Sequence, residues 1–375
     1  MRLALVTGAC PQGECGVGDY TTCLDKALRA RGVESHVIAS QDWGVGSVLT
    51  VRQSLRSRNF EIVHIEYPTV GFGARLGPQA LSLLQGCVVT IHEASQRHFL
   101  RKLALFPFSI RPQHIIFTSH FEREFATKWT PWIRRVSSVI PVGSNIGVGA
   151  RKMPRDLYEV VYFGLIMPGK GMEHVVELSR LIRSAGLSLK VRIIGKAPFR
   201  YLDYLKRLRS ETAYLPIIWD IDLTEEQVAE RLAGASIAYL PYPDGASERR
   251  TTLKAALVNG VAVLTTRSSQ TPHSLGEAVR FCASAKDALE TISYLIQHPE
   301  EMARISNAAA CSGGAFTWAG IAEQHVRVYQ SVLDQESSRK QLQLDCKQIE
   351  AAVRNESTQS EHISKICPDT VISTK

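Results

Sequence analysis

The chain has 375 residues, enough for two ordinary α/β domains with separate hydrophobic cores. Hydrophobic residues make up 45% of it without forming a run of eighteen, so no membrane-spanning helix is predicted, and the opening MRLALVTGAC predicts a strand rather than a signal peptide. Eight scattered cysteines without a CxxC pair favour buried thiols in a reducing cytoplasm over disulfides or a zinc site, and the formal charge of +8 favours anionic partners.

Strands and helices alternate through the first part of the sequence. Short apolar runs predict strands, and amphipathic periodicity predicts helices between them, the first closed by Gly32. The strands are expected at 2–8, 34–40, 62–67, 87–93, 114–119 and 135–143, and the helices at 18–32 and 47–58. This alternation favours a parallel, doubly wound α/β sheet, whose ligands bind at the carboxyl ends of the strands.

A segment rich in glycine, proline and charge at 141–156 predicts a linker, after which the same alternation restarts. Strands are expected at 158–164, 189–195, 237–242 and 261–266, and helices at 171–186, 225–235, 286–296, 300–310 and 319–335. The predicted organisation is two Rossmann-like domains, 1–145 and 146–318, that face each other across a cleft. The helix at 319–335 is expected to pack back towards the first domain, and 336–375 is expected to be a polar, disordered tail.

Basic residues are concentrated between positions 97 and 135. Eight lysines and arginines lie there against only Glu122 and Glu124. Such an imbalance creates a positive field that attracts phosphates, anionic lipid headgroups or nucleic acid, and a solvated basic face is the alternative. Because no recognised nucleic-acid-binding motif accompanies the charge, nucleic acid is not an expected partner.

A turn with several glycines follows the first strand, in GACPQGECGVGDY. Gly8, Gly13, Gly16 and Gly18 would let an anionic ligand approach the N–H groups at the start of the next helix, and a purely structural loop is the alternative. The spacing is not the GxGxxG nicotinamide fingerprint, and no acidic residue ends the second strand, so a dehydrogenase is not expected.

The turn FGLIMPGKG (163–171) begins the second half. Lys170 lies between two glycines at a helix start, where its charge would add to the helix dipole and suit a diphosphate. A surface lysine in a turn is the alternative. Gly164 and Gly195 each end a strand of this half and are expected to contribute to the same site.

The stretch DGASERRTTLKAALVNGVAVLTT (244–266) begins as a turn and continues as a buried helix and a strand. At the helix start lie Ser247, Glu248, Arg249, Arg250, Thr251 and Thr252. Guanidinium groups, hydroxyls and free N–H groups would converge there on one strongly anionic group, most simply a pyrophosphate. The alternative is that Arg249 and Arg250 pair with carboxylates from the other half.

Polar side chains also end two strands of the first half. His92 and Glu93 follow VVTI, and Glu66 ends the strand in HIEYP. A histidine at the carboxyl end of a strand is well placed to meet a substrate hydroxyl, and a structural histidine is the alternative. The sequence contains no Ser-His-Asp order, Walker loop, DxD or HExxH motif.

Taken in order, these segments resemble bacterial glycosyltransferases of family 4, which have the two-domain GT-B fold. The resemblance spans roughly residues 1–335 and rests on the order of five segments rather than on one turn. In the first half, the family's glycine loop and first helix resemble GVGDYTTCLDKALRARG, its acceptor-side histidine strand resembles VVTIHE, and its approach to the linker resembles VIPVGSNI. In the second half, the lysine loop of the donor domain resembles VVYFGLIMPGKGMEHVVEL. The donor-phosphate segment resembles LAGASIAYLPYPDGASERRTTLKAALVNGVAVLTT.

The chain departs from the family pattern at the donor site. Family members carry two glutamates eight apart, where this chain has Ser247 and Ala255, with Glu248 one place away from the first. Lys170 is kept, but Leu165 replaces the arginine that usually precedes it in the loop. The second glutamate holds the nucleotide ribose in the family, so Ala255 puts that contact in doubt. A subgroup with an SxRR stretch is similar at this position.

The resemblance implies a retaining transfer of sugar from a nucleotide diphosphate sugar, with no metal or other cofactor. Lys170, Arg249 and the helix start at 247–252 would stabilise the leaving diphosphate, and His92 would bind the donor sugar near the reacting carbon. The acceptor would be a saccharide or polyprenyl-linked sugar in cell-surface or exopolysaccharide assembly.

Basic and apolar residues intermix in RHFLRKLALFPFSIR (97–111), which would contact the inner face of the plasma membrane from the cytoplasm. Two rival functions are open. One is a non-catalytic GT-B protein that binds a nucleotide or a partner protein. The other is a nucleotide-sugar 2-epimerase on the same fold.

Overall fold

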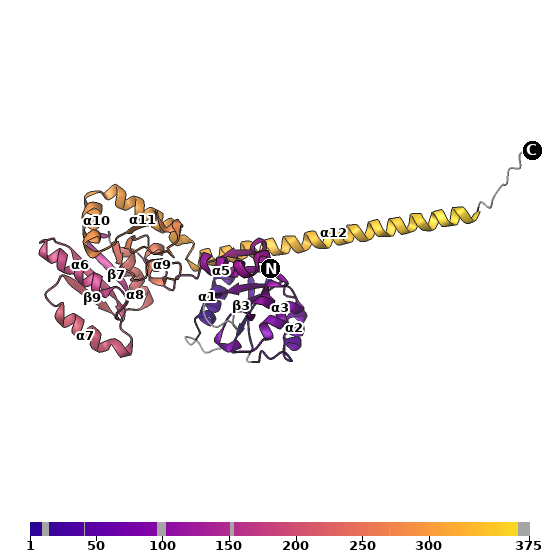
Figure 1. Cartoon of the computed structure of the whole chain (residues 1–375), viewed down its shortest axis with the longest axis horizontal. Helices are drawn as coiled ribbons and strands as arrows, with labels where there is room; N and C mark the ends of the chain where they lie inside the picture. Colours follow the sequence, from indigo (N-terminus) through magenta and orange to yellow (C-terminus); the bar gives the residue numbers. More distant parts are fainter. Residues whose placement is uncertain (10–14, 41, 96–102, 151–153, 270, 367–375) are drawn as a thin grey trace, which may run out of the picture. The chain divides into compact units, whose positions relative to one another are not determined.

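The computed structural model describes residues 1–9, 15–40, 42–95, 103–150, 154–269 and 271–366, and it contains two parallel sheets of six strands each (Figure 1). The strand order is β2-β1-β3-β4-β5-β6 in the first sheet and β12-β11-β10-β7-β8-β9 in the second. Helices connect successive strands, so both faces of each sheet are covered and the central strands are buried along most of their length. The predicted α/β class with two doubly wound parallel sheets is confirmed.

The first sheet and its helices come from residues 2–139. The order is β1 (Arg2–Gly8), α1 (Gly16–Ala30), β2 (Glu34–Ser40), α2 (Val48–Ser57), β3 (Ile62–Tyr67), η1 (Val70–Phe72), α3 (Gly77–Leu84), β4 (Cys87–Ile91), η2 (Phe106–Ser109), β5 (Pro112–Phe117), α5 (His120–Trp129), η3 (Pro131–Val136) and β6 (Ser137–Val139). β4 ends one residue before His92, and α1 begins at Gly16, earlier than predicted. His92 therefore lies past the sheet edge, and Gly16 and Gly18 belong to the first turn of α1.

The second sheet and its helices come from residues 156–314. The order is β7 (Asp156–Leu165), α6 (Met172–Ser184), β8 (Lys190–Lys196), η4 (Phe199–Tyr201), α7 (Leu202–Glu211), β9 (Ile217–Ile221), α8 (Glu225–Gly234), β10 (Ala235–Leu240), α9 (Thr251–Val258), β11 (Ala262–Thr265), η5 (His273–Leu275), β12 (Val279–Phe281), α10 (Ala285–Gln297) and α11 (Pro299–Gly314). α9 packs against α11, and its last six residues are buried. This packing fixes the N-terminus of α9 at the carboxyl end of β10.

The last helix, α12, runs from Trp318 to Ile366. The expectation of a helix at 319–335 followed by a disordered tail from 336 is wrong for residues 336–366, which are helical; residues 367–375 lie outside the described part of the chain. This segment contains neither glycine nor proline and is rich in Gln, Glu, Lys, Arg and Ala, which all favour a helix without an apolar stripe. At its start, Glu323 pairs with Arg31 of α1 at 2.9 Å, so residues 318–325 pack against the first half.

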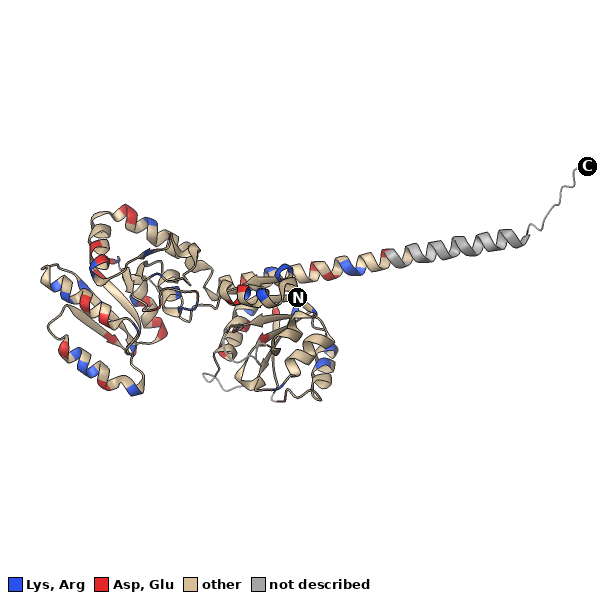
Figure 2. Cartoon of the chain, viewed as in Figure 1, with Lys and Arg blue, Asp and Glu red and all other residues tan. Residues whose placement is uncertain are grey.

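Charged residues of both signs mix on the helices of the second half (Figure 2). On α7, Lys206 pairs with Asp203 at 3.5 Å and Arg207 with Glu211 at 3.9 Å. These side chains are exposed and contribute little to stability. They mark a solvated surface rather than a ligand site.

Candidate active site

A cavity of about 1340 Å³ lies at the carboxyl ends of β3 and β4 and the N-termini of α1 and α9. Six of the predicted site residues line it: Gly16, His92, Glu93, Glu248, Arg249 and Thr251. Eight others do not: Gly18, Glu66, Gly164, Lys170, Gly195, Ser247, Arg250 and Thr252. The strand ends of the first half and one helix start of the second therefore contribute to a single cavity, as the sequence predicts.

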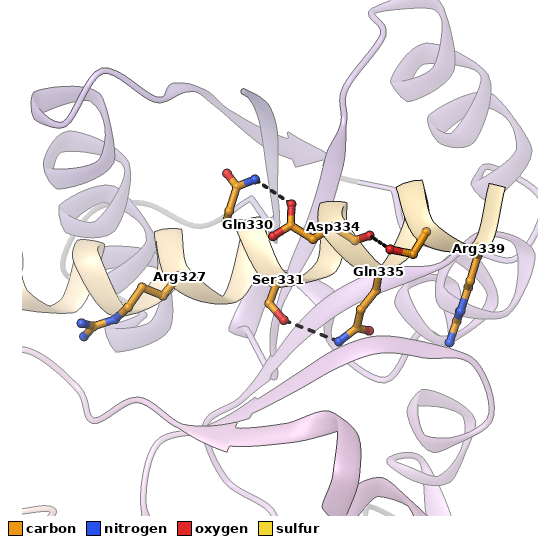
Figure 3. A pocket seen from close by; sticks show the side chains of 7 residues that line it. Arg327, Gln330, Ser331, Asp334, Gln335 and Arg339 are labelled. Atoms are coloured by element: carbon orange, nitrogen blue, oxygen red, sulfur yellow. Dashed lines mark hydrogen bonds between the residues drawn. The ribbon is translucent and has the colours of Figure 1, made fainter. Parts of the chain in front are cut away.

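A second hollow, of about 660 Å³, lies along α12 and has no comparable chemistry (Figure 3). Its lining side chains all belong to this one helix, and they bond to one another one turn apart. Gln330 donates to Asp334 at 3.0 Å, and Ser338 donates to the carbonyl of Asp334 at 2.9 Å. These are the ordinary side-chain contacts of an exposed polar helix.

His92 is held at the cavity wall by a buried carboxylate. Its Nε2 lies 2.9 Å from Oε2 of Glu66, and Tyr20 meets the ring edge-on at 4.8 Å between centroids. Glu66, a candidate substrate-binding residue, is fully buried and does not line the cavity, and its contact with the site is the bond that orients His92. Glu93, predicted beside them, lines the cavity itself.

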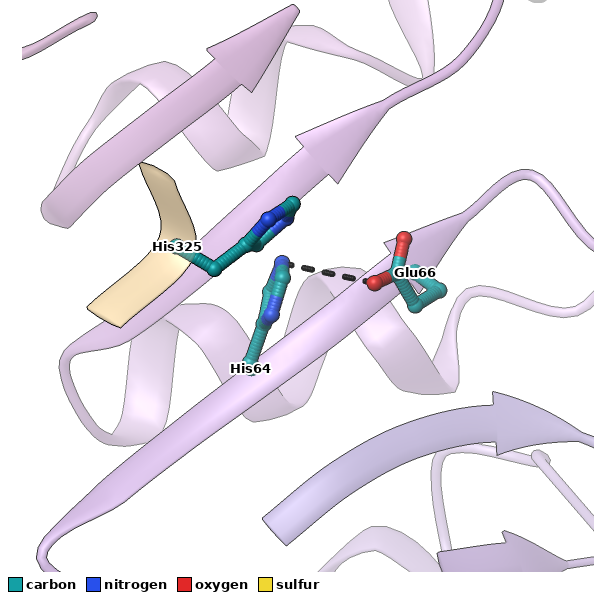
Figure 4. Close-up of side chains that lie close together, drawn as sticks. All are labelled: His64, Glu66 and His325. Atoms are coloured by element: carbon teal, nitrogen blue, oxygen red, sulfur yellow. Dashed lines mark ion pairs between the residues drawn. The ribbon is translucent and has the colours of Figure 1, made fainter. Parts of the chain in front are cut away.

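Further imidazoles surround Glu66, and together they could hold a metal ion (Figure 4). His64 from β3 and His325 from α12 are buried beside it. Burial alone would raise the pKa of Glu66, but the neighbouring imidazoles of His64 and His92 outweigh it and hold that pKa below its ordinary value. Burial lowers the pKa of His64 to about 4.

The N-terminus of α9 opens on the cavity, and Arg250 at its N-cap position makes no side-chain capping bond, although the Tyr242 hydroxyl bonds the backbone of Leu253. Thr251 lines the cavity, while the hydroxyl of Thr252 lies 2.7 Å from that of Tyr242 and is turned away from it. Uncapped N–H groups at a helix start, together with the helix dipole, favour an anion. The helix start for which a diphosphate is predicted therefore lies at the cavity.

The two arginines before α9 both form ion pairs. Arg249 pairs with Glu122 of the first half and lies 3.3 Å from the hydroxyl of Ser95, which is the alternative pairing considered above. Arg250 instead pairs with Asp244 of its own half, and its guanidinium lies 4.6 Å from the Tyr242 ring centroid. Of the two, Arg249 lines the cavity and Arg250 does not.

Glu122 was not predicted as a site residue, yet it organises the loop after β4. It is fully buried, and its carboxylate accepts hydrogen bonds from the N–H groups of Ala94 and Ser95 at 2.8 and 2.7 Å, as well as bonding Arg249. Glu248 makes a second contact between the halves, accepting from the N–H of His120 at 2.8 Å. No sequence pattern joins the two halves here, because Glu122 lies 127 positions from Arg249 and Glu248 lies 128 positions from His120.

Lys170 lies in a loop whose backbone is fixed. The carbonyl of Lys170 accepts from the hydroxyl of Tyr162 at 3.0 Å, and Gly171 has φ of +82° with a carbonyl of Pro241 only 2.0 Å from where a Cβ would lie. Gly164 and Gly195 are paired across β7 and β8, and a Cβ on Gly195 would meet the Gly164 carbonyl at 2.1 Å. These two glycines therefore allow close backbone contact, and Lys170 itself is half-buried outside the cavity lining.

Lys254 is a further charged residue of the cavity that the sequence analysis missed. It is 3% exposed, its Nζ donates to the carbonyl of Val142 at 2.9 Å, and it lies 5.4 Å from the Phe316 ring centroid. Burial lowers its pKa to about 8, although nearby Glu248 acts in the opposite direction. A lysine inside the otherwise apolar run LKAALV was the signal that could have identified it.

The lowered pKa of Lys254 predicts how stability depends on pH. Since the folded pKa is about 8 and the ordinary value is 10.5, the unfolded chain retains a proton between these values that the folded chain has lost. The free energy of unfolding should therefore rise with pH over this range, by up to about 3 kcal/mol. Urea unfolding of the wild type and Lys254→Met across this range should show a growing difference in the wild type's favour.

The exposed Lys206 provides the control, because Lys206→Met should differ from the wild type by a pH-independent amount. A constant difference between the wild type and Lys254→Met across the same range would contradict the prediction.

Some of the predicted sites fall partly outside the described residues. These are Gly13 of the first glycine turn and residues 97–102 of the predicted membrane segment. In the described remainder of that segment, Leu103, Phe106 and Ile110 are exposed. Among the described helices, none combines the length and apolarity that crossing a bilayer would require.

Comparison with models of known protein families and with curated proteins gives no match. Among solved structures, the chain is similar to HepE of Anabaena in complex with UDP and glucose, with a TM-score of 0.60 and 14% identity over 88% of this chain and 100% of that one. It is also similar to a glycosyltransferase of Rickettsia africae, with a TM-score of 0.63 and 13% identity over 88% and 98% of the two chains. A sucrose-phosphate synthase of Thermosynechococcus elongatus has a TM-score of 0.59 and 15% identity over 89% and 100%.

These likenesses cover both sheets. They show that the chain has the GT-B fold of glycosyltransferases, as the resemblance in the sequence implied. At such identities they define the fold, and the chemistry of this chain has to be argued from its own cavity.

Proposed function

We propose that this protein is a retaining glycosyltransferase that moves a sugar from a nucleotide diphosphate sugar to a saccharide or lipid-linked acceptor. The observation that carries the proposal is the cavity, which is lined by the start of α9, by Arg249 and by His92. A helix start with an adjacent guanidinium suits a diphosphate leaving group, and a histidine in the same cavity suits a sugar hydroxyl. The UDP and glucose bound by HepE support a donor of this class.

To accelerate this reaction, the protein has to stabilise the negative charge that develops on the leaving group. As the bond to the sugar breaks, negative charge grows on the diphosphate, and the N–H groups of α9 with Arg249 would oppose it. In this proposal Arg249 leaves Glu122 when the donor binds, and Lys170 approaches from its fixed loop. The acceptor would attack the sugar from the same face that the leaving group leaves. This retains the anomeric configuration without a protein nucleophile and without a metal.

We further propose that the first half contacts an anionic membrane surface, as polysaccharide assembly on a lipid carrier would require. Two exposed tryptophans support this contact: Trp129 is 71% exposed and Trp132 is 54% exposed. Phe106 meets Trp132 with ring centroids 6.2 Å apart, and the exposed basic residues Lys128, Arg134 and Arg135 flank them in sequence. Tryptophans beside basic residues suit the interface of an anionic bilayer.

The membrane contact predicts a specific loss on mutation. Trp129→Ala/Trp132→Ala should sediment with vesicles of phosphatidylcholine and phosphatidylserine roughly tenfold less than the wild type, about 1.4 kcal/mol of binding. Phe199→Ala, at a 91% exposed aromatic of the second half, is the matched control and should bind as the wild type does. The proposed membrane contact would be rejected if the wild type bound equally well to vesicles with and without phosphatidylserine, or if the double variant bound as the wild type does.

A panel of nucleotide diphosphate sugars tests the enzymatic proposal. The full chain, incubated with each donor and a mixture of saccharide and polyprenyl-linked acceptors, should release nucleoside diphosphate from one donor, and proton NMR should show a product with the donor's anomeric configuration. Nucleotide binding without sugar release from any donor would favour a non-catalytic GT-B protein. Interconversion of donors in the absence of acceptor would favour an epimerase.

A further inference from the structure

A buried cluster of metal-ligating groups lies behind His92. His64 and Glu66 come from β3, His325 comes from the start of α12, and all three are fully buried. One ligand atom from each lies within 4.8 Å of the others, and the imidazole of His64 and the carboxylate of Glu66 face each other with His325 beside them (Figure 4). The cluster is separate from the cavity, whose lining includes none of the three.

Each of the two histidines turns its Nε2 atom towards a hydroxyl group. Nδ1 of His325 lies 2.9 Å from the carbonyl of Ile321, so it carries the proton, and the basic Nε2 lies 3.4 Å from the hydroxyl of Tyr20. Nε2 of His64 lies 2.8 Å from the hydroxyl of Thr90, which can donate as well as accept, and 3.7 Å from Oε1 of Glu66. A metal ion would replace these hydroxyls as the partner of Nε2 in each imidazole.

Glu66 is the group that needs a further partner. Its Oε2 is bonded to His92, but its Oε1 is buried and accepts no hydrogen bond from any described residue. In the described part of the chain, no lysine or arginine forms an ion pair with this carboxylate. A fully buried carboxylate is costly unless it is paired or binds a metal ion.

We propose that His64, Glu66 through Oε1, and His325 form a binding site for a divalent transition-metal ion, most simply Zn²⁺. Two imidazole nitrogens and one carboxylate oxygen are an established zinc ligand set. The ligand atoms would have to close from their present spread to about 3.4 Å apart, as in a tetrahedral site with bonds of about 2.1 Å, which small side-chain rotations supply.

The ion would have a structural role, since it would join the start of α12 to β3. The bond from His92 to Oε2 of Glu66 would support the ligand from behind, as outer-shell partners of metal sites do. The sequence predicted no metal site, because the two histidines come from opposite ends of the chain and follow no ligand spacing. This inference does not rest on the proposed sugar transfer and places no ion in the cavity.

Metal analysis of three forms of the full chain tests the site. Wild type expressed in zinc-supplemented medium and dialysed should retain close to one zinc ion per chain, and added Zn²⁺ should raise the midpoint of thermal unfolding of the chelator-treated protein. His325→Gln should bind Zn²⁺ at least about tenfold more weakly in titration calorimetry, a loss that even outer-shell substitutions reach. His114→Gln, at a half-buried histidine of β5 that bonds Ser138 at 2.9 Å, is the matched control and should bind as the wild type does.

If His325→Gln fails to fold, measurements on the wild type alone still decide whether the site exists. X-ray absorption of the zinc-loaded wild type should then show nitrogen and oxygen ligands only, at about 2.0–2.1 Å. Absence of retained zinc and of a thermal shift in the wild type overturns the site. Equal affinity of a folded His325→Gln, or sulfur ligation from the chain's cysteines, overturns it as well.

Discussion

Replacing His92 by alanine is expected to lower the rate of sugar transfer about a hundredfold while leaving the affinity for nucleoside diphosphate nearly unchanged. The side chain lines the cavity, and Glu66 fixes its ring at 2.9 Å, so its contact to the sugar is pre-organised for the transition state. Diphosphate binding is assigned to the start of α9 and to Arg249, and it should not need the His92 side chain. Steady-state kinetics with the preferred donor, together with calorimetry for the nucleoside diphosphate, would separate the two effects.

His114→Ala is the control for this experiment, because it removes a histidine of the same sheet that does not line the cavity. Its transfer rate should stay within about twofold of the wild type. A His92→Ala enzyme that transfers sugar as fast as the wild type would remove His92 from the proposed site.

Arg249→Ala is expected to weaken nucleoside diphosphate binding at least tenfold, or about 1.4 kcal/mol. Arg249 is the guanidinium that lines the cavity beside α9, and its bond to Glu122 is the one that a diphosphate would replace. Arg250→Ala should have a smaller effect, because Arg250 is held by Asp244 and Tyr242 outside the cavity lining. Titration calorimetry of both variants would rank the two residues.

Arg304→Ala is the matched control, because it also removes an arginine that forms an ion pair. Arg304 lies on α11 and pairs with Glu301 at 2.8 Å. Thermal unfolding would check that each variant is folded. Equal affinities of the wild type and Arg249→Ala would contradict the assignment of the diphosphate to this helix start.

The alternation of strands and helices allowed the fold to be predicted, because the strands of a parallel sheet that is buried on both faces appear in the sequence as repeated apolar runs. Two strands and the second part of the last helix were not predicted, for physical reasons. β9, IIWDI, is only half-buried along its length, and β12 has three residues, so neither produces a clear apolar run. The continuation of α12 beyond residue 335 was missed because it has helix-forming residues without an apolar stripe.

The site was predictable where a residue's role follows from its position in an element. His92 and Thr251 lie at a strand end and a helix start, which are favoured ligand positions in α/β sheets. The pairing of Arg249 with Glu122, the burial of Lys254 and the meeting of His64 with His325 depend on contacts between distant parts of the chain. A single sequence carries no local pattern for such contacts.

A crystal structure of the protein with bound nucleoside diphosphate is the most direct test of the account. We predict that the phosphates lie against the N–H groups at the start of α9, with Arg249 released from Glu122 and bonded to them. A nucleotide bound elsewhere, with Arg249 still paired to Glu122 and the start of α9 unoccupied, would contradict it.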